Sequence, residues 1–207
     1  MDVRDSYDSA GDAYTSHLAA ELDHKPLDRH LLNRFAEDVR GRGLVADLGC
    51  GPGHVAKYLQ DQGVSVVGID LSSEMIRCAT RLNPAVEFRT GDMRALDVPT
   101  ASLAGVIAFY AIVHFRNDEL RPVLTEMRRV VVPGGLALLA FHIGEQVVHA
   151  EDLFGAPVSL DFVFHSPQAV VETLGAAGFA VIERTEREPY EGMEYQSRRC
   201  YLLARAV

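Results

Sequence analysis

The sequence predicts a doubly wound α/β fold, in which a mostly parallel sheet of seven strands carries helices on both faces. From Leu44 onward, short runs of β-branched residues alternate with segments of helical periodicity, a pattern typical of parallel strands joined by crossover helices. The first run leads into a glycine-rich stretch that ends at Gly53. Ligands bind such sheets outside the carboxyl ends of the strands, so a binding site is expected there.

Each element follows from a local pattern. Strands are expected at residues 44–48, 65–70, 86–89, 105–109, 136–141, 180–186 and 199–204, and helices between them at 55–62, 73–82, 118–130 and 167–177. The last helix begins with Ser166 and Pro167 and ends before Gly178, which are the usual signals at the two ends of a helix. Two more helices, at residues 8–21 and 27–40, should lie outside the sheet as an N-terminal cover.

The composition disfavours several classes of protein. The longest apolar runs have the length of a strand, far below the roughly 20 residues that span a membrane, and the first ten residues lack the apolar region of a secretory signal. A cytoplasmic protein without membrane contact is therefore expected. The three cysteines form no C-x-x-C pair, which argues against a disulfide framework or a metal site. The formal net charge of −9 repels polyanions and disfavours nucleic acid as a partner.

Residues 45–53, Val-Ala-Asp-Leu-Gly-Cys-Gly-Pro-Gly, carry the densest signal in the chain. A dinucleotide fingerprint requires Gly or Ala at position 54, where His54 stands instead. Asp47 precedes the first glycine by two residues. A carboxylate there repels a pyrophosphate but attracts a ligand that bears ammonium and sulfonium charges. Two further acids, Asp70 and Asp92, follow the next two strands, and Asp70 is placed to accept both ribose hydroxyls of a nucleoside.

Residues 45–53 resemble the first motif of the class I SAM-dependent methyltransferases, hhDhGCGxG, and match it at every position. The resemblance extends over about residues 7–141. It implies the Rossmann-like methyltransferase sheet with a reversed last strand, S-adenosylmethionine (SAM) as cofactor and S-adenosylhomocysteine as product. The stretch from Tyr7 to Tyr14 is similar to the small-molecule members, in which a tyrosine-bearing helix closes over the cofactor.

The resemblance also implies the residues of the cofactor site. Asp92 would bond the adenine amino group and Met93 would pack on its ring, while Met75 either covers the adenine or belongs to the core. The stretch from Phe109 onward resembles the fourth motif, which passes beneath the methionine part of the cofactor and next to its methyl group. The expected cofactor-binding residues are Tyr7, Tyr14, Asp47, Gly49, Cys50, Gly51, Asp70, Leu71, Met75, Asp92, Met93, Phe109 and Tyr110.

The chain of 207 residues suits one domain with additions. We expect a helical cover over residues 1–43, a cofactor-binding core over 44–142, a substrate-side insertion over 143–165, and a C-terminal helix and strand pair over 166–207. The insertion has no clean period, and its aromatic and histidine side chains suit the wall of a pocket. A packed surface excursion is an equally weighted alternative.

Methyl transfer from a sulfonium is an in-line displacement, so the protein must mainly position the acceptor and exclude water. A hydroxyl or a protonated amine also needs a base, and histidine suits that role near neutral pH. His114 and His142 follow strands whose carboxyl ends face the crevice, so we expect them to be catalytic. No metal is expected.

The sequence therefore predicts an enzyme that moves the methyl group of SAM to an oxygen or nitrogen atom of a small-molecule acceptor. The Asn/Asp-Pro-Pro-Tyr/Phe motif of enzymes that methylate nucleic-acid bases is absent. A monomer or a homodimer is expected. Two alternatives stay open: a SAM-binding protein without transferase activity and, less favoured, an NAD(P)-dependent oxidoreductase on the same type of sheet.

Overall fold

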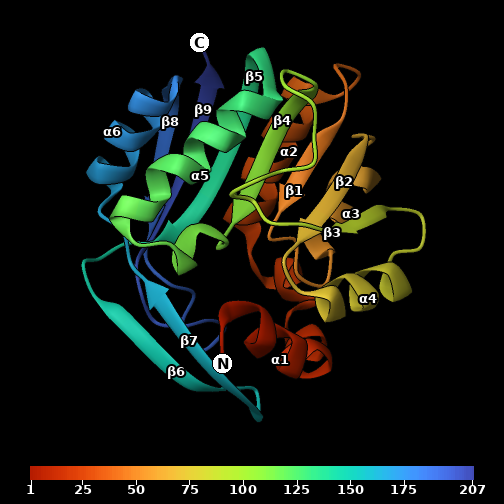
Figure 1. The fold of residues 1–207 in the computed structure, drawn as a ribbon, viewed down its shortest axis with the longest axis vertical. Helices are drawn as coiled ribbons and strands as arrows, with labels where there is room; N and C mark the ends of the chain where they lie inside the picture. The colour runs from red at the N-terminus through yellow and green to blue at the C-terminus, as the bar shows by residue number, and fades with distance from the viewer.

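The computed structural model describes residues 1–207 and contains a seven-stranded sheet with helices on both faces (Figure 1). The strands are β1 (Val45–Leu48), β2 (Val66–Asp70), β3 (Glu87–Thr90), β4 (Leu103–Phe109), β5 (Val131–His142), β8 (Phe179–Arg187) and β9 (Arg199–Ala206). Their order is β3-β2-β1-β4-β5-β9-β8. β9 alone runs opposite to the other six strands, which confirms the predicted sheet with a reversed last strand.

The helices agree closely with the predicted ones in the core of the chain. They are α1 (Val3–Leu18), α2 (Pro26–Val39), α3 (His54–Asp61), α4 (Ser73–Leu82), α5 (Asn117–Val130) and α6 (Pro167–Ala177), with short 3₁₀ helices η1 (Glu21–His24) and η2 (Ile112–His114). Helix α6 begins at Pro167 and ends at Gly178, which adopts a φ of 95° that favours glycine. In α4, the Ser72 hydroxyl caps the first turn by accepting from the Met75 N–H at 3.0 Å.

Two apolar cores hold the helices to the two faces of the sheet. Helices α2 and α3 cover one face, where Phe35, Leu59 and Leu138 belong to one buried cluster. Helices α5 and α6 cover the other face with a larger cluster. Gly105 in β4 lies against the Phe35 ring, which a Cβ would meet at 3.0 Å. Helix α2 is thus part of the sheet's packing as well as an N-terminal cover.

Most of the insertion at residues 143–165, for which the sequence predicts neither a strand nor a helix, forms a β-hairpin of β6 (Val147–Leu153) and β7 (Ala156–Val163). Alternate residues of β7 are buried from Ala156 to Leu160, but β6 has no fully buried residue and its register shifts after Ala150. Because the sequence of β6 has only a weak strand period, it does not predict the hairpin.

Helix α1 starts at Val3, five residues before its predicted start. The Asp2 carboxylate accepts from the Asp5 N–H at 2.9 Å and fixes this first turn. Figure 1 shows α1 and the hairpin side by side beneath the sheet. Ala10 of α1 packs in a small apolar cluster with Val158 and Leu160 of β7. The N-terminal helix and the insertion therefore form one cover.

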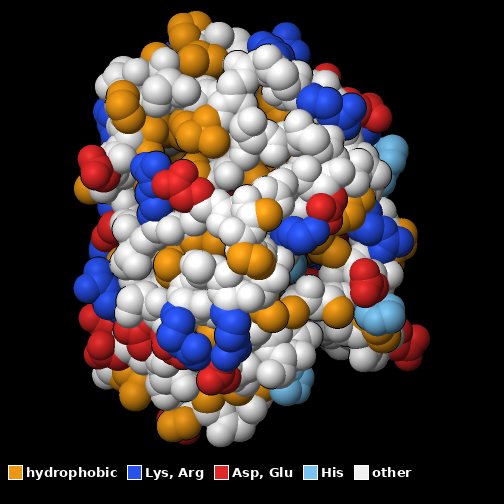
Figure 2. Space-filling view, turned by 90° about the vertical axis from the view of Figure 1, so that its right-hand side faces the viewer, with side chains coloured by type: hydrophobic (Ala, Val, Ile, Leu, Met, Phe, Trp, Pro, Cys, Tyr) orange, Lys and Arg blue, Asp and Glu red, His pale blue; other side chains and the backbone are white.

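The face around α4 and β3 carries acidic and basic side chains side by side (Figure 2). Arg77 and Arg81 both pair with Asp12, at 3.2 and 2.9 Å, and Arg89 pairs with Glu87 at 2.7 Å. These arginines are partnered and form no continuous basic surface. None of the helices in the chain combines the length and the apolar character that crossing a bilayer requires.

Replacing Phe35 by alanine tests the packing of α2 on the sheet. Phe35 is fully buried, and loss of such a ring costs about 3–5 kcal/mol of unfolding free energy. Phe154→Ala is the matched control, because that ring is 42% exposed. Urea denaturation followed by circular dichroism measures both variants. Equal losses in the two variants would contradict the packing described here.

Candidate functional site

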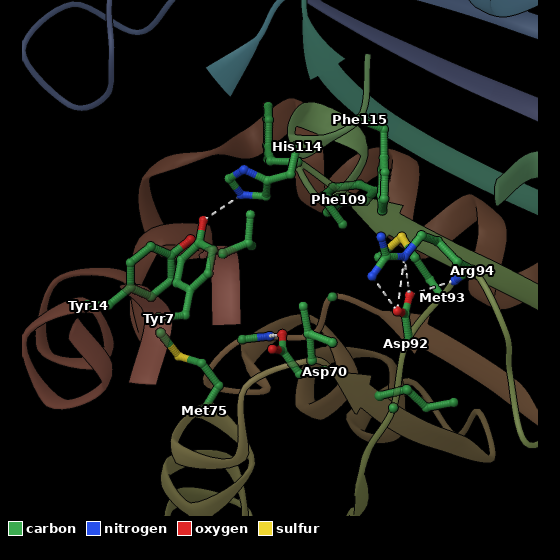
Figure 3. A pocket seen from close by; sticks show the side chains of 18 of the residues that line it. Tyr7, Tyr14, Asp70, Met75, Asp92, Met93, Arg94, Phe109, His114 and Phe115 are labelled. Carbon is green, nitrogen blue, oxygen red and sulfur yellow. Dashed lines mark hydrogen bonds and ion pairs between the residues drawn. The ribbon is translucent and has the colours of Figure 1, made fainter. Parts of the chain in front are cut away.

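A pocket of about 230 Å³ lies between the carboxyl ends of the sheet strands and helix α1 (Figure 3). Most of the residues expected to bind the cofactor line the wall of this pocket. They are Tyr7, Tyr14, Gly49, Gly51, Asp70, Leu71, Met75, Asp92, Met93, Phe109 and Tyr110. Asp47, Cys50 and His142 lie outside the wall, whereas His114 belongs to it. Tyr7 and His114, 107 residues apart in sequence, thus meet at this site.

The glycine-rich loop after β1 forms part of the floor. Gly49 and Gly51 have φ values of 67° and 51°, in the left-handed region that favours glycine. A Cβ on Gly49 would lie 2.5 Å from the Cβ of Ala111, so any side chain there would displace the segment after β4. On Gly51 it would reach Tyr14 at 3.7 Å. The loop therefore exposes bare main chain to the pocket.

The Asp70 carboxylate is held by backbone donors on both of its oxygens. Oδ2 accepts from the Gly51 N–H at 2.8 Å and Oδ1 accepts from the Ser72 N–H at 2.9 Å. Burial raises the pKa of Asp70, and these two hydrogen bonds oppose that shift. Each carboxylate oxygen still has a lone pair to offer. Asp70 can therefore accept hydrogen bonds from a diol in the pocket.

Asp92 lines the other end of the pocket, where it pairs with Arg94 (Figure 3). Arg94 Nε lies 3.0 and 2.9 Å from the two carboxylate oxygens, and Nη2 lies 2.6 Å from Oδ2. Hydrogen bonding from Arg94 lowers the pKa of Asp92. The sequence analysis did not predict this arginine partner, although Arg94 lies only two residues after Asp92. A ligand amino group that bonds Asp92 must share the carboxylate with Arg94.

Asp47 and Cys50 are buried behind the glycine loop. Asp47 is 2% exposed, its Oδ2 has no hydrogen-bond partner, and burial raises its pKa to about 7. The Cys50 thiol is directed at the Gly51 carbonyl oxygen, 3.7 Å away. Both side chains therefore support the loop from behind in this structure, and the sequence did not reveal that orientation.

Tyr7 and Tyr14 project from α1 into the pocket beside His114 (Figure 3). His114 Nδ1 lies 3.1 Å from the carbonyl oxygen of Asp161. Since a carbonyl only accepts, Nδ1 carries the proton and Nε2 accepts from the Tyr7 hydroxyl at 2.8 Å. Burial lowers the pKa of His114 to about 4. The ring is therefore neutral at physiological pH.

His142, the other histidine expected to be catalytic, lies outside the pocket wall. Its ring stacks on Phe164 with centroids 5.0 Å apart, and Nδ1 bonds the Ser197 hydroxyl at 2.7 Å. Burial, aided by the charge of Arg199, lowers its pKa to about 3. The stacking and the hydrogen bond hold the ring beside that of Tyr110, with centroids 5.2 Å apart, and of these two residues only Tyr110 lines the pocket.

Helix α1 is anchored on both sides of the pocket by residues that sequence reasoning missed. On one side, Asp8 Oδ1 accepts from the Ser72 hydroxyl at 2.5 Å and from the Glu74 N–H at 3.1 Å. On the other side, the Ser6 hydroxyl accepts from the Ser159 N–H at 3.1 Å. No local motif marks these contacts, because their partners lie at least 64 residues away.

A buried polar network supports Tyr110, whose φ of 53° is unusual for a residue with a side chain. The hydroxyls of Tyr110 and Tyr201 are 3.0 Å apart, and Tyr201 donates to Asp28 Oδ2 at 2.9 Å. Arg187 also reaches Asp28, at 3.2 Å. Lys25 lies over the Tyr110 ring, 5.3 Å from its centroid. This network fixes one wall of the pocket.

Comparisons with known proteins agree with this geometry. A family model described as a methyltransferase domain matches residues 45–135. Malonyl-(acyl-carrier protein) O-methyltransferase from Pseudescherichia vulneris is 33% identical over 133 residues, which are 64% of this chain and 50% of that protein. Trans-aconitate 2-methyltransferase from Azoarcus sp. is 37% identical over 111 residues, which are 50% of this chain and 43% of that protein. The chain thus spans half or less of the length of these curated relatives.

A solved structure shares the fold over almost the whole chain. Magnesium protoporphyrin IX methyltransferase from Synechocystis, with SAM bound, superposes with a TM-score of 0.76 at 20% identity, covering 99% of this chain and 95% of that one. The matched family model runs from β1 to the first part of β5 and includes the glycine loop, Asp70 and Asp92. The family model, the partial relatives and the shared fold together support assignment to the class I SAM-dependent methyltransferase family, with S-adenosylmethionine as the methyl donor.

Proposed function

We propose that this protein transfers the methyl group of SAM to an oxygen or nitrogen atom of a small-molecule acceptor. One observation carries the proposal: the pocket joins a nucleoside-type floor, built on Asp70 and the glycine loop, to a histidine and two tyrosine hydroxyls at its other side. A binding floor next to polar groups at the methyl end is what methyl transfer requires, because catalysis consists mainly of positioning.

The pocket residues fit the cofactor by their chemistry. The free lone pairs of Asp70 suit a ribose diol, Asp92 suits the adenine amino group, and Leu71 and Met93 offer apolar surface to its ring. Gly49 and Gly51 leave room for the methionine part along bare main chain. When bound, the cofactor supplies an electrophilic methyl group on a sulfonium.

The tyrosine-bearing helix α1 excludes water from the methyl end in this proposal. Tyr7 and Tyr14 cover the pocket, and burial raises the pKa of both hydroxyls, so they remain hydrogen-bond donors. Phe109 and Tyr110 close the wall after β4. A dry site strengthens the electrostatic interactions of the reacting groups.

The second part of the proposal concerns the acceptor. The relatives named for malonyl-(acyl-carrier protein) O-methylation and trans-aconitate 2-methylation support a small or carrier-bound acceptor, and the first of them supports an oxygen atom. Of the two expected catalytic histidines, only His114 lines the pocket. His114 Nε2 accepts from the Tyr7 hydroxyl at 2.8 Å, so it would receive a proton from a hydroxyl or amine acceptor only after that bond is broken.

Binding and turnover test the proposal together. Isothermal titration should detect SAM and S-adenosylhomocysteine but not NAD, because the loop lacks the dinucleotide spacing and carries His54 where that motif requires Gly or Ala. Incubation with SAM and a panel of small acids, alcohols and amines should release S-adenosylhomocysteine. Binding without turnover across the panel would favour a SAM-binding protein that lacks transferase activity, and binding of NAD alone would contradict the family's chemistry in this chain.

Asp70→Ala should weaken the binding of S-adenosylhomocysteine. The change removes hydrogen bonds to a charged acceptor. Each such bond contributes about 1.5–3 kcal/mol to the free energy of binding. The loss of one bond corresponds to roughly a 10- to 150-fold increase in the dissociation constant. Asp23→Ala is the matched control, because Asp23 is exposed and lies outside the pocket. If folded Asp70→Ala protein had an unchanged dissociation constant for S-adenosylhomocysteine, Asp70 would have a structural role only, at the end of β2.

Helix α1 should become more protected when the cofactor product binds. Tyr7 and Tyr14 would contact the ligand, and α1 is fixed to the rest of the molecule mainly by side-chain hydrogen bonds and one small apolar cluster. Amide hydrogen exchange of residues 3–18 should slow on addition of S-adenosylhomocysteine, whereas helix α6 serves as an internal reference. Equal protection of α1 with and without ligand would mean that the helix is permanent structure.

A further inference from the structure

We infer that the acceptor is a carboxylic acid, which binds as its carboxylate beside Tyr14 and is methylated on oxygen without a general base. The inference rests on the proposed methyl transfer and specifies its acceptor. It follows from the surroundings of His114, from the charges of the two reactants, and from the hydrogen-bond donors at that end of the pocket.

His114 lacks the partners of a histidine base. A base that becomes an imidazolium usually faces a carboxylate through its second nitrogen. Here Nδ1–H donates to a main-chain carbonyl, that of Asp161, whose own carboxylate turns away to His149 at 2.8 Å and to Arg116 at 3.4 Å. An imidazolium at position 114 would therefore have no carboxylate to stabilise it directly.

The carboxylates that line the pocket are all engaged elsewhere. Asp70 accepts from two backbone N–H groups, Asp92 pairs with Arg94, and Glu119 accepts from the Arg116 N–H at 2.9 Å. Consistent with this arrangement, burial lowers the pKa of His114 to about 4. A pKa this low is close to that of a carboxylic acid, but a carboxylic acid is already ionised at neutral pH and needs no base. For an alcohol, whose pKa is far higher, His114 is much too weak a base.

A carboxylate needs no base, and its reaction with a sulfonium balances without any further reactant. A lone pair of one carboxylate oxygen forms the new O–C bond, the C–S bond breaks with its electron pair on sulfur, and no proton moves. The products are a neutral ester and a neutral thioether. Opposite charges attract strongly in a buried site of low dielectric, so the pocket favours bringing this pair of reactants together.

The Tyr14 hydroxyl is the free donor at this end of the pocket. The Tyr7 hydroxyl is committed to His114, whereas the Tyr14 hydroxyl lines the pocket without a hydrogen-bond partner in the protein. The two rings are perpendicular, with centroids 5.5 Å apart, so both hydroxyls reach the same region (Figure 3). The Tyr7–His114–Asp161 chain holds α1 against the hairpin and thereby positions Tyr14.

The experiment uses SAM labelled in its methyl group and pairs of probes with one carbon skeleton, an acid beside its alcohol and its amine. We expect label only from acids, in a product that mild alkali converts to labelled methanol, the signature of a methyl ester. Alkali-stable label from an alcohol or an amine would overturn the carboxylate acceptor while leaving methyl transfer intact. Absence of turnover with every probe would contradict the proposed function as well.

Two variants separate base catalysis from positioning. His114→Gln should keep kcat/KM for the best acid within about tenfold, whereas loss of a general base costs roughly 10²- to 10⁴-fold. Tyr14→Phe should lower kcat/KM for the acid about 10- to 150-fold, as for a lost bond to a charged group, with a smaller change in S-adenosylhomocysteine affinity. Tyr58→Phe, which loses a hydroxyl bonded to Asn33 away from the pocket, is the control. A hundredfold loss in folded His114→Gln would overturn the inference.

Discussion

A short chain of hydrogen bonds from Gly51 through Asp70 and Ser72 to Asp8 holds the functional half of the molecule together. It ties the glycine loop to the end of β2, and Ser72 also caps α4 by accepting from the Met75 N–H. Its last link secures α1 over the pocket. The floor and the cover of the site therefore share one fully buried serine, and a change at Ser72 affects both at once.

The sequence predicted the fold well where structure is decided locally. Strand periods, the caps of α6 and the glycine loop all depend on neighbours within a few residues, and these elements agree with the structure. The hairpin, the early start of α1 and the partner of Asp92 were missed. His142 likewise faces Phe164 and not the pocket. The environment of His142 depends on Phe164 and Ser197, which are distant in sequence and leave no period there. The other three features involve neighbours in sequence, but a single cap, an ion pair and a weakly periodic hairpin also leave no apolar period that would predict them.

The buried polar network behind Tyr110 includes buried charges and a strained backbone conformation, both of which are unfavourable for folding. Burying charges such as those of Arg187 and Asp28 is unfavourable unless each finds partners, and Asp28 Oδ1 has none. The same network orients Tyr110 in a backbone conformation that a residue with a side chain rarely adopts. Strain and buried charge coincide at the wall next to the methyl end, where a rigid surface is most useful for in-line transfer.

The two ends of the pocket differ in how their polar groups are satisfied. At the end where we propose that the nucleoside binds, Asp70 and Asp92 are charge-bearing acceptors fixed by backbone N–H groups and by Arg94. At the end proposed for the methyl group, His114 is a neutral ring with both nitrogens bonded, and the tyrosines offer only hydroxyls. A positively charged ligand group placed between these ends meets no charge repulsion from His114. In the proposed reaction, an anionic acceptor would be attracted by the positive charge of the sulfonium.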